Sequence, residues 1–335
     1  MHGRDANDDH DESETEQAVA AGSTDHEQRP DDAKQTYSGF GVRRSLSQLA
    51  GVVRNDPADP QAVANLKAWV EEDVRRIEGQ LGHELTDQRI LEIGPGQGLE
   101  RAHYLGRHNT VEALDMDAAA IGFDPNGWLA IWRTNGTGRM VKTIGREALV
   151  AHRLRRRWVE AVGGDEFILP ARHQGDICTW SNEGDPFDVA VSWSVFEHVA
   201  DPRRAILATL RALRPGGVAM ISIHNYTSFN GHHDIRSFSG SDDERLLWGH
   251  LRPSAASFVE PSAYLNEWRL RDWRELFDDV LPGHEEHLGN PAEPDVFEQA
   301  LDGPIGDELS DYDREELLAV NIVYVGRRPD ELPDD

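Results

Sequence analysis

Three glycines at alternate positions follow a short apolar segment near residue 90. The segment reads Leu91-Glu92-Ile93-Gly94-Pro95-Gly96-Gln97-Gly98. Glycine adopts the positive φ of a tight turn without strain and lets a ligand come close to the backbone. The pattern predicts a strand, a turn and a helix that begins at about Leu99. It is typical of a ligand-binding loop, although an ordinary glycine-rich turn has the same composition.

The spacing of the glycines distinguishes two classes of cofactor. A dinucleotide-binding loop has the pattern Gly-x-Gly-x-x-Gly. Counted from Gly94 and Gly96, its third glycine would stand where this chain has Leu99. The observed pattern is Glu-x-Gly-x-Gly-x-Gly, which argues against NAD.

An aspartate closes the next apolar segment. Asp115 lies 21 positions after Gly94, at the end of Thr110–Asp115. A carboxylate at such a strand end can accept hydrogen bonds from both ribose hydroxyls of an adenosine cofactor. Asp117 is the second candidate, but an acid at a helix N-terminus explains it as well.

Further motifs follow in a fixed order. Gly175-Asp176-Ile177 comes next, then Asp185-Pro186-Phe187-Asp188 before an apolar segment, then Phe196-Glu197-His198-Val199 and finally Leu213-Arg214-Pro215-Gly216-Gly217. With the glycine loop, this series from about residue 88 to 225 resembles the class I methyltransferases that depend on S-adenosylmethionine (SAM), in their small-molecule branch.

The resemblance implies a role for each matched residue. In that family the glycine loop contacts the methionine part and ribose of SAM, and the acid before it lies beside the cofactor's amino group, as Glu92 would here. Asp115 would bind the ribose, Asp176 the adenine amino group, and Ile177 would lie against the adenine ring. The predicted cofactor contacts are Glu92, Gly94, Gly96, Gly98, Asp115, Asp176, Ile177 and Ser192.

Histidines follow the predicted strand 218–223, at the end where residues face the ligand crevice of a parallel sheet. Transfer of a methyl group to a hydroxyl needs a base, and imidazole titrates in a suitable range. His224 is the first candidate, followed by His232 and His233, while polar loop histidines without chemistry are the alternative. These three with Asp234 could also bind a metal, but adjacent residues on a strand point apart, so we predict no metal site.

A basic stretch interrupts an acidic chain. Between residues 133 and 157 eight Lys and Arg residues stand against the single acid Glu147, while the whole chain has a formal net charge of −27. We interpret this stretch as a site for an anionic acceptor, with pairing to the acidic surface or a subunit contact as alternatives. The arginines assigned to that acceptor site are Arg133, Arg139, Arg153, Arg155 and Arg156.

The elements that position these residues alternate between strand and helix. The strands predicted are 89–93, 110–115, 187–193, 218–223 and 319–325, and the helices 60–81, 202–213 and 268–280. Nearly continuous apolar strands predict an α/β fold: a Rossmann-like, doubly wound, mostly parallel sheet with helices on both faces. We expect the last strand to be antiparallel and a helical insertion to follow the second strand.

The chain is expected to divide into four parts. Residues 1–43 are rich in acids and have no aromatic residue before Tyr37, which is typical of a disordered tail. An N-terminal helical segment covers 44–87, the SAM-binding domain 88–326, and a charged tail 327–335. Two insertions are expected within the domain, at about 117–165 and, on the acceptor side, at about 225–265.

Composition restricts the setting and the partners. There is one cysteine, no apolar signal or membrane segment, and only three lysines among 34 basic residues. These features favour a cytoplasmic protein, and the acidic, lysine-poor surface resembles that of proteins from halophilic archaea. The negative charge opposes binding to nucleic acids and membranes, while the oligomeric state is not readable from the sequence.

We therefore predict a SAM-dependent methyltransferase that acts on a small-molecule or glycan-like acceptor, at oxygen. An NAD-dependent oxidoreductase or sugar epimerase is one alternative, although no lysine follows a tyrosine by four positions. A SAM-binding module without activity is the other.

Overall fold

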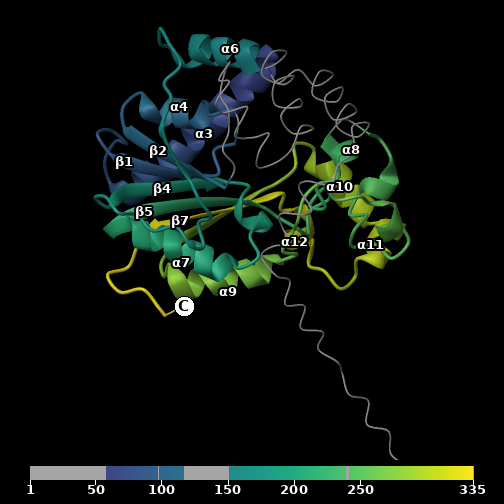
Figure 1. Cartoon of the computed structure of the whole chain (residues 1–335). Helices are drawn as coiled ribbons and strands as arrows, with labels where there is room; N and C mark the ends of the chain where they lie inside the picture. Colours follow the sequence, from purple (N-terminus) through teal and green to yellow (C-terminus); the bar gives the residue numbers. More distant parts are fainter. Residues whose placement is uncertain (1–57, 97, 117–150, 239–240, 335) are drawn as a thin grey trace, which may run out of the picture.

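The structure, a computed structural model, describes residues 58–96, 98–116, 151–238 and 241–334. Its centre is a seven-stranded sheet in the order β3-β2-β1-β4-β5-β7-β6 (Figure 1). Every neighbouring pair from β3 to β5 is parallel, and β7 is antiparallel to both β5 and β6. The predicted α/β class and the antiparallel last strand are confirmed.

The predicted strands occur close to their expected positions. Three have the expected bounds: β1 (Arg89–Ile93), β2 (Thr110–Asp115) and β4 (Phe187–Trp193). β5 (Leu213–His224) begins earlier than expected, because Leu213 already pairs with Phe187 before a register shift. β7 (Asn321–Arg327) begins and ends two residues later than expected.

Two strands were not predicted, β3 (Ala171–Gln174) and β6 (Glu285–Gly289). They are the edge strands, and neither has a fully buried side chain. An edge strand needs no apolar face, so hydrophobic patterning does not reveal it.

The first described helix, α3 (Pro60–Leu81), has the ends that the sequence predicts. The Asp59 carboxylate accepts a hydrogen bond of 2.8 Å from the Gln61 backbone N–H, and Gly82 ends the helix with φ of 77°. Proline at the first helical position completes the N-terminal signal. With α4 (Glu100–Gly106) and α6 (His152–Val162), α3 covers one face of the sheet (Figure 1).

The opposite face is covered by α7 (Pro202–Ala212) and α9 (Leu270–Val280). Their apolar side chains pack with Leu91, Ile93 and Ile221 in the largest cluster of the core. α7 ends one residue earlier than the sequence predicts, and α9 begins two residues later. A sheet covered on both faces holds the ends of its strands rigidly, which is what a site at those ends requires.

A third group of short helices lies beyond the end of β5 (Figure 1). It contains α8 (Ile235–Phe238), η3 (Glu244–Leu246), η4 (Ala256–Phe258), α10 (Pro294–Leu301), α11 (Pro304–Glu308) and α12 (Arg314–Leu318). These segments have a separate apolar cluster around Trp248 and Leu317. Another short helix, η2 (Phe196–His198), follows β4 directly.

Several predictions lie outside the described residues. They are the acidic tail, the start of the N-terminal helical segment, Asp117, and the part of the basic stretch that contains Arg133 and Arg139. None of the helices within the described ranges combines the length and apolar character needed to cross a bilayer.

Candidate active site

The glycine loop leaves the end of β1 as a tight turn. Gly94 and Gly96 have φ of 64° and 68°, and Leu99 reaches 59° just before α4. The Gly94 backbone N–H donates a hydrogen bond of 2.8 Å to the Leu114 carbonyl, which fixes the loop to the end of β2. The turn therefore adopts the positive φ values that its glycines predict.

The three glycines have different surroundings. A Cβ on Gly94 would lie 2.3 Å from Val195 Cγ2, so this glycine allows the loop after β4 to pack against the loop after β1. At Gly98 the space is taken by the Glu100 carboxylate. A Cβ on Gly96 would meet nothing within 4 Å. Among the three, Gly96 is thus where a ligand can approach the backbone directly.

Glu92 precedes the loop and is buried, with 2% of its surface exposed. Its Oε2 atom is buried and makes no hydrogen bond. Burial raises the pKa of this carboxyl to about 8, and the nearby Arg101 guanidinium opposes the rise. An unpartnered carboxylate oxygen at this position suits the positively charged amino group of SAM, which the family resemblance places beside Glu92.

Behind Glu92 lies a buried polar network that the sequence analysis missed. The Arg101 guanidinium lies 4.8 Å from the centre of the Trp193 ring, and Trp193 Nε1 donates a 2.7 Å hydrogen bond to Asp73. Asp73 is also paired with Arg76 at 2.8 Å. A signal for the network was present, because Asp73 lies on the apolar stripe of its helix, between Val70 and Ile77.

The acids predicted to bind the cofactor lie at neighbouring strand ends. Asp115 ends β2, and its carbonyl accepts a 3.0 Å hydrogen bond from the Gly175 N–H, so the turn containing Asp176 lies beside it. Asp176 Oδ1 accepts a 2.9 Å hydrogen bond from the Cys178 N–H. The structure thus brings Asp115 and Asp176 to the same edge of the sheet.

Ile177 and Ser192 are more deeply buried than their predicted roles suggest. Ile177 is 4% exposed and packs in the core with Leu91 and Leu114. Ser192 is fully buried, and its hydroxyl donates a 3.1 Å hydrogen bond to the Ile93 carbonyl. Ser192 therefore links β4 to β1 directly before the glycine loop, and its hydroxyl already has a partner.

A cluster of imidazoles lies where β4 and β5 end. The ring of His233 lies 4.5 Å from that of His224 and 4.9 Å from that of His198, measured between ring centres. His224 Nε2 is 2.9 Å from Asn230 Oδ1. Burial lowers the pKa of His224 and His198, and lowers that of His233 to about 2, so all three are neutral at pH 7.

His232 differs from its neighbour. It is fully buried, its Nε2 is 2.9 Å from the Leu246 carbonyl, and its Nδ1 accepts a 2.9 Å hydrogen bond from the Asp234 N–H. Asp234 itself is paired with Arg236. With both ring nitrogens in use, His232 has a structural position and no nitrogen left for a substrate, which corrects its selection as a candidate base.

Glu197 completes the cluster and was not selected from the sequence. It is 2% exposed, and neither carboxylate oxygen makes a hydrogen bond of normal geometry. Burial raises its pKa to about 8, while backbone N–H groups of Glu197 and His224 offset a little of this. One donor atom from each of Glu197, His198 and His233 lies within 4.8 Å of the other two.

A hollow of about 460 Å³ opens elsewhere, between the turn after β3 and α7. Cys178 and Trp180 line it on one side and Arg204 and Arg211 on the other. None of the predicted site residues lines this hollow, so the functional groups described above do not belong to it.

The predicted anion-binding arginines are described only in part, on α6. Arg156 is paired with Glu160 at 3.1 Å, and the Arg155 guanidinium lies 5.7 Å from the centre of the Phe167 ring. Arg157 donates to the Ala58 carbonyl. At least these three arginines therefore have contacts within the chain, and α6 packs against α3 and α4 rather than against the histidines.

The fold and the loop define a class of protein: a Rossmann-like methyltransferase with its cofactor loop after the first strand. A family model described as a methyltransferase domain matches residues 65–280. The chain belongs to this family, and it is a SAM-dependent methyltransferase. No curated protein matches the sequence.

Solved structures with similar folds have low sequence identity. One is the YcgJ protein of Bacillus subtilis, with 16% identity, 73% of this chain and 94% of that chain covered, and a TM-score of 0.37. The Mesorhizobium loti SAM-dependent methyltransferase has 16% identity, coverage of 73% and 92%, and a TM-score of 0.39. Phosphoethanolamine N-methyltransferase 2 of Haemonchus contortus has 14% identity, coverage of 87% and 60%, and a TM-score of 0.41. These values support no conclusion about the acceptor.

The residues present fit SAM as the methyl donor. The unpartnered Glu92 Oε2 suits the amino group, the backbone at Gly96 is open to a ligand, and Asp115 lies at the adjacent strand end. These three residues would hold the cofactor, together with Asp176 at its adenine end. The individual contacts of the cofactor-binding residues stay predictions.

Proposed function

We propose that the chain transfers the methyl group of SAM to a hydroxyl oxygen of a small-molecule or glycan-like acceptor. The observation that carries this proposal is the cluster of neutral imidazoles at the ends of β4 and β5. One of its members, His198, follows Val195, which packs against Gly94 of the cofactor loop, and the other two come from the end of β5 and the turn after it. The acceptor would thus lie beside the cofactor's methyl group and next to a group that can take up a proton.

His224 is the best candidate for the proton acceptor. The Asn230 amide oxygen can only accept a hydrogen bond, so His224 Nε2 carries the proton in the 2.9 Å contact between them. His224 Nδ1 then holds the free lone pair. Because burial lowers the pKa of His224, the imidazole is uncharged at pH 7 and able to accept the hydroxyl proton. His233, with its pKa lowered to about 2, is too weak a base for this role.

The division of work between cofactor and protein follows. SAM supplies an electrophilic methyl group on a sulfonium centre. The chain's own residues bind the cofactor through the loop after β1, hold the acceptor oxygen in line, exclude water and remove the proton. A hydroxyl acceptor loses a proton during methylation and needs a base, whereas a neutral amine can attack without one, which is the reason for preferring oxygen to nitrogen.

The test begins with a screen of alcohols, phenols and sugars as acceptors, in which release of S-adenosylhomocysteine reports turnover. The best acceptor is then used to compare the kcat of the His224→Gln variant with that of the unchanged protein. We expect the variant to bind SAM normally and to lose about 10²–10⁴-fold in kcat with the best acceptor. The loss should shrink at high pH, where the acceptor hydroxyl ionises without help. Equal turnover by both proteins, or a uniform loss at every pH, would remove His224 from this role.

An anionic acceptor is a second element of the proposal, supported by the density of positive charge around α6. Arg153 and Arg156 are exposed on this helix in a chain of net charge −27. We expect Arg155→Glu with Arg156→Glu to raise the KM for an anionic acceptor and to spare both SAM affinity and neutral acceptors. A loss of SAM affinity without a change in acceptor KM would contradict it.

The setting is proposed from composition. The strong negative charge and the three lysines support a cytoplasmic protein adapted to high salt, because concentrated salt screens the repulsion between surface carboxylates.

A further inference from the structure

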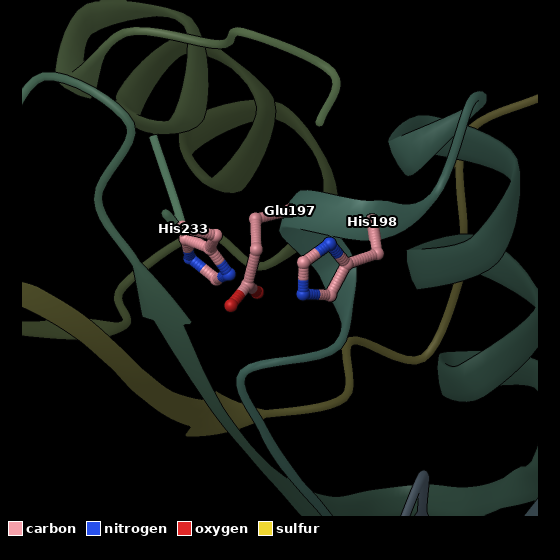
Figure 2. Close-up of side chains that lie close together, drawn as sticks. All are labelled: Glu197, His198 and His233. Carbon is pink, nitrogen blue, oxygen red and sulfur yellow. The ribbon is translucent and has the colours of Figure 1, made fainter. Parts of the chain in front are cut away.

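We propose that Glu197, His198 and His233 form a binding site for one divalent transition-metal ion. The three residues come from η2 and from the turn after β5, 35 positions later in the chain. Figure 2 shows the Glu197 carboxylate between the two imidazole rings. Their donor atoms all lie within 4.8 Å of one another. The inference goes beyond methyl transfer, because nothing in that reaction requires a metal.

The spacing of the donor atoms is close to what an ion needs. Bonds of about 2.0–2.2 Å from a tetrahedral metal to nitrogen and oxygen place neighbouring ligands roughly 3.3–3.6 Å apart. Side-chain shifts of about 1 Å would bring the three donor atoms from their present spacing to that value. Such shifts lie within ordinary rotamer adjustment at the end of a glutamate side chain.

Glu197 is the strongest part of the argument. A buried carboxylate without a hydrogen bond is costly unless a cation or several donors compensate it. Glu197 is 2% exposed, and within the described part of the chain it forms no ion pair. Neither oxygen has a hydrogen bond of normal geometry, although the backbone N–H groups of Glu197 and His224 are close enough to offset part of the rise in its pKa. A cation between Glu197 and the imidazoles would compensate the charge directly.

The histidines are held as metal ligands usually are. His198 Nδ1 lies 2.7 Å from the Tyr264 carbonyl, so this nitrogen carries the proton and Nε2 has the lone pair for an ion. His233 Nε2 is buried without a hydrogen bond. The His233 carbonyl accepts a 2.6 Å hydrogen bond from the Ser262 hydroxyl, which fixes its position.

The loop that carries Glu197 and His198 is fixed in the same way. The Asn266 side-chain amide donates to the carbonyls of Phe196 and Val199, at 2.8 and 3.0 Å. The Asn266 backbone N–H donates to the Glu197 carbonyl at 2.9 Å. The segment 262–266 therefore positions all three donor residues, which is the work of an outer shell around a metal.

The donor set selects the class of metal. Two imidazoles with one carboxylate suit Zn²⁺, Co²⁺, Fe²⁺ or Ni²⁺, whereas Mg²⁺ and Ca²⁺ prefer oxygen ligands. Three protein ligands leave at least one coordination position for water or for an oxygen of a substrate. The alternative weighed from the sequence was a different ligand set, made of His224, His232 and His233 with Asp234. In the structure both ring nitrogens of His232 have hydrogen-bond partners and Asp234 is paired with Arg236.

The test uses the untagged full chain, freed of metal by a chelator and titrated with Co²⁺ without SAM. High salt and excess Mg²⁺ suppress weak binding to the acidic surface. We expect one Co²⁺ per chain, visible absorption bands of a four- or five-coordinate ion, and displacement by Zn²⁺. Glu197→Gln and His233→Gln should each weaken binding by roughly tenfold or more.

The matched control is His108→Gln, at an exposed histidine before β2, which should bind Co²⁺ like the unchanged protein. SAM binding by each variant shows that it is folded. Absence of Co²⁺ binding by the unchanged protein, or equal binding by Glu197→Gln and His108→Gln, would overturn the proposal. Because SAM and acceptor are absent, such a result leaves the proposed methyl transfer untouched.

Discussion

Two buried carboxylates adjoin, along the chain, the two residues Gly94 and Val195 that pack against each other, and different groups surround them. Glu92 and Glu197 are each 2% exposed, each has an oxygen without a hydrogen bond, and burial raises the pKa of each to about 8. Glu92 has the Arg101 guanidinium nearby, which opposes the rise. Among the described residues, Glu197 has neutral imidazoles and the backbone N–H groups of Glu197 and His224 beside its side chain, and no guanidinium.

The comparison shows how one chemical feature can indicate two ligands. At Glu92 the surrounding loop has positive φ values, an open backbone at Gly96 and an acid at the neighbouring strand end, which together suit an amino acid and a ribose. At Glu197 the neighbours are imidazoles: one ring nitrogen of His198 is held by the Tyr264 carbonyl, and the backbone carbonyl of His233 is held by the Ser262 hydroxyl, an arrangement that suits a metal ion. In both cases the buried carboxylate suits a positively charged ligand. The neighbouring groups indicate whether that ligand is an amino group or a metal ion.

The largest effect is expected when each of the two carboxylates is replaced by an amide, in two separate variants. Glu92→Gln should weaken SAM binding about tenfold to a hundredfold, because it removes a charge-assisted hydrogen bond of ~1.5–3 kcal/mol. Glu197→Gln should leave SAM affinity unchanged. Isothermal titration calorimetry of both variants with SAM measures the difference, and equal losses would mean that the two sites are not distinct.

A smaller effect is expected from the contact that joins the two sites. Gly94→Ala places a Cβ against Val195 Cγ2 in a residue with φ of 64°, and should cost about 1–2 kcal/mol of folding stability. Adding Val195→Ala should restore the stability that Gly94→Ala loses through the clash with Val195. It should not restore the stability lost through the positive φ of residue 94. Chemical denaturation of the three proteins measures both parts, and equal stability of single and double variants would show that the contact carries no strain.

The sequence predicts those features that depend on local patterns. α3 was predicted with its bounds because Asp59, Pro60 and Gly82 provide end signals around an apolar stripe. β1, β2 and β4 were predicted because they are short apolar segments. The edge strands β3 and β6 were missed because polar residues fill them, and the start of β5 because a proline and two glycines hide a strand.

The sites show the same limit. The glycine loop and Asp115 follow directly from a strand and its end, so spacing along the chain is sufficient to propose them as cofactor-binding groups. Glu197 and His233 are 36 positions apart, and only the return of the chain after β5 brings them together. His232 and His233 are both candidates from the sequence because both follow a predicted strand end. In the structure both ring nitrogens of His232 have hydrogen-bond partners, whereas the ring of His233 lies in the imidazole cluster.

The smallest expected effect is on the pH dependence of SAM affinity, which should involve Glu92 and not Glu197. The pKa of Glu92 is raised to about 8 in the unbound protein, so at pH 6 to 7.5 most of it is protonated. Binding of a cationic amino group favours the ionised form and releases the proton, so SAM affinity should rise with pH in this window, by less than about tenfold per unit. Glu92→Gln should abolish the rise, whereas Glu197→Gln should retain it although that carboxyl titrates over the same range.

SAM titrations of the unchanged protein and the two variants at pH 6.0, 6.75 and 7.5 measure how SAM affinity depends on pH. Repeating the calorimetry in two buffers with different ionisation enthalpies also measures the protons released on binding. A slope that survives Glu92→Gln and disappears in Glu197→Gln would assign the cofactor's positive charge to the histidine cluster, and would reverse the roles proposed for the two sites.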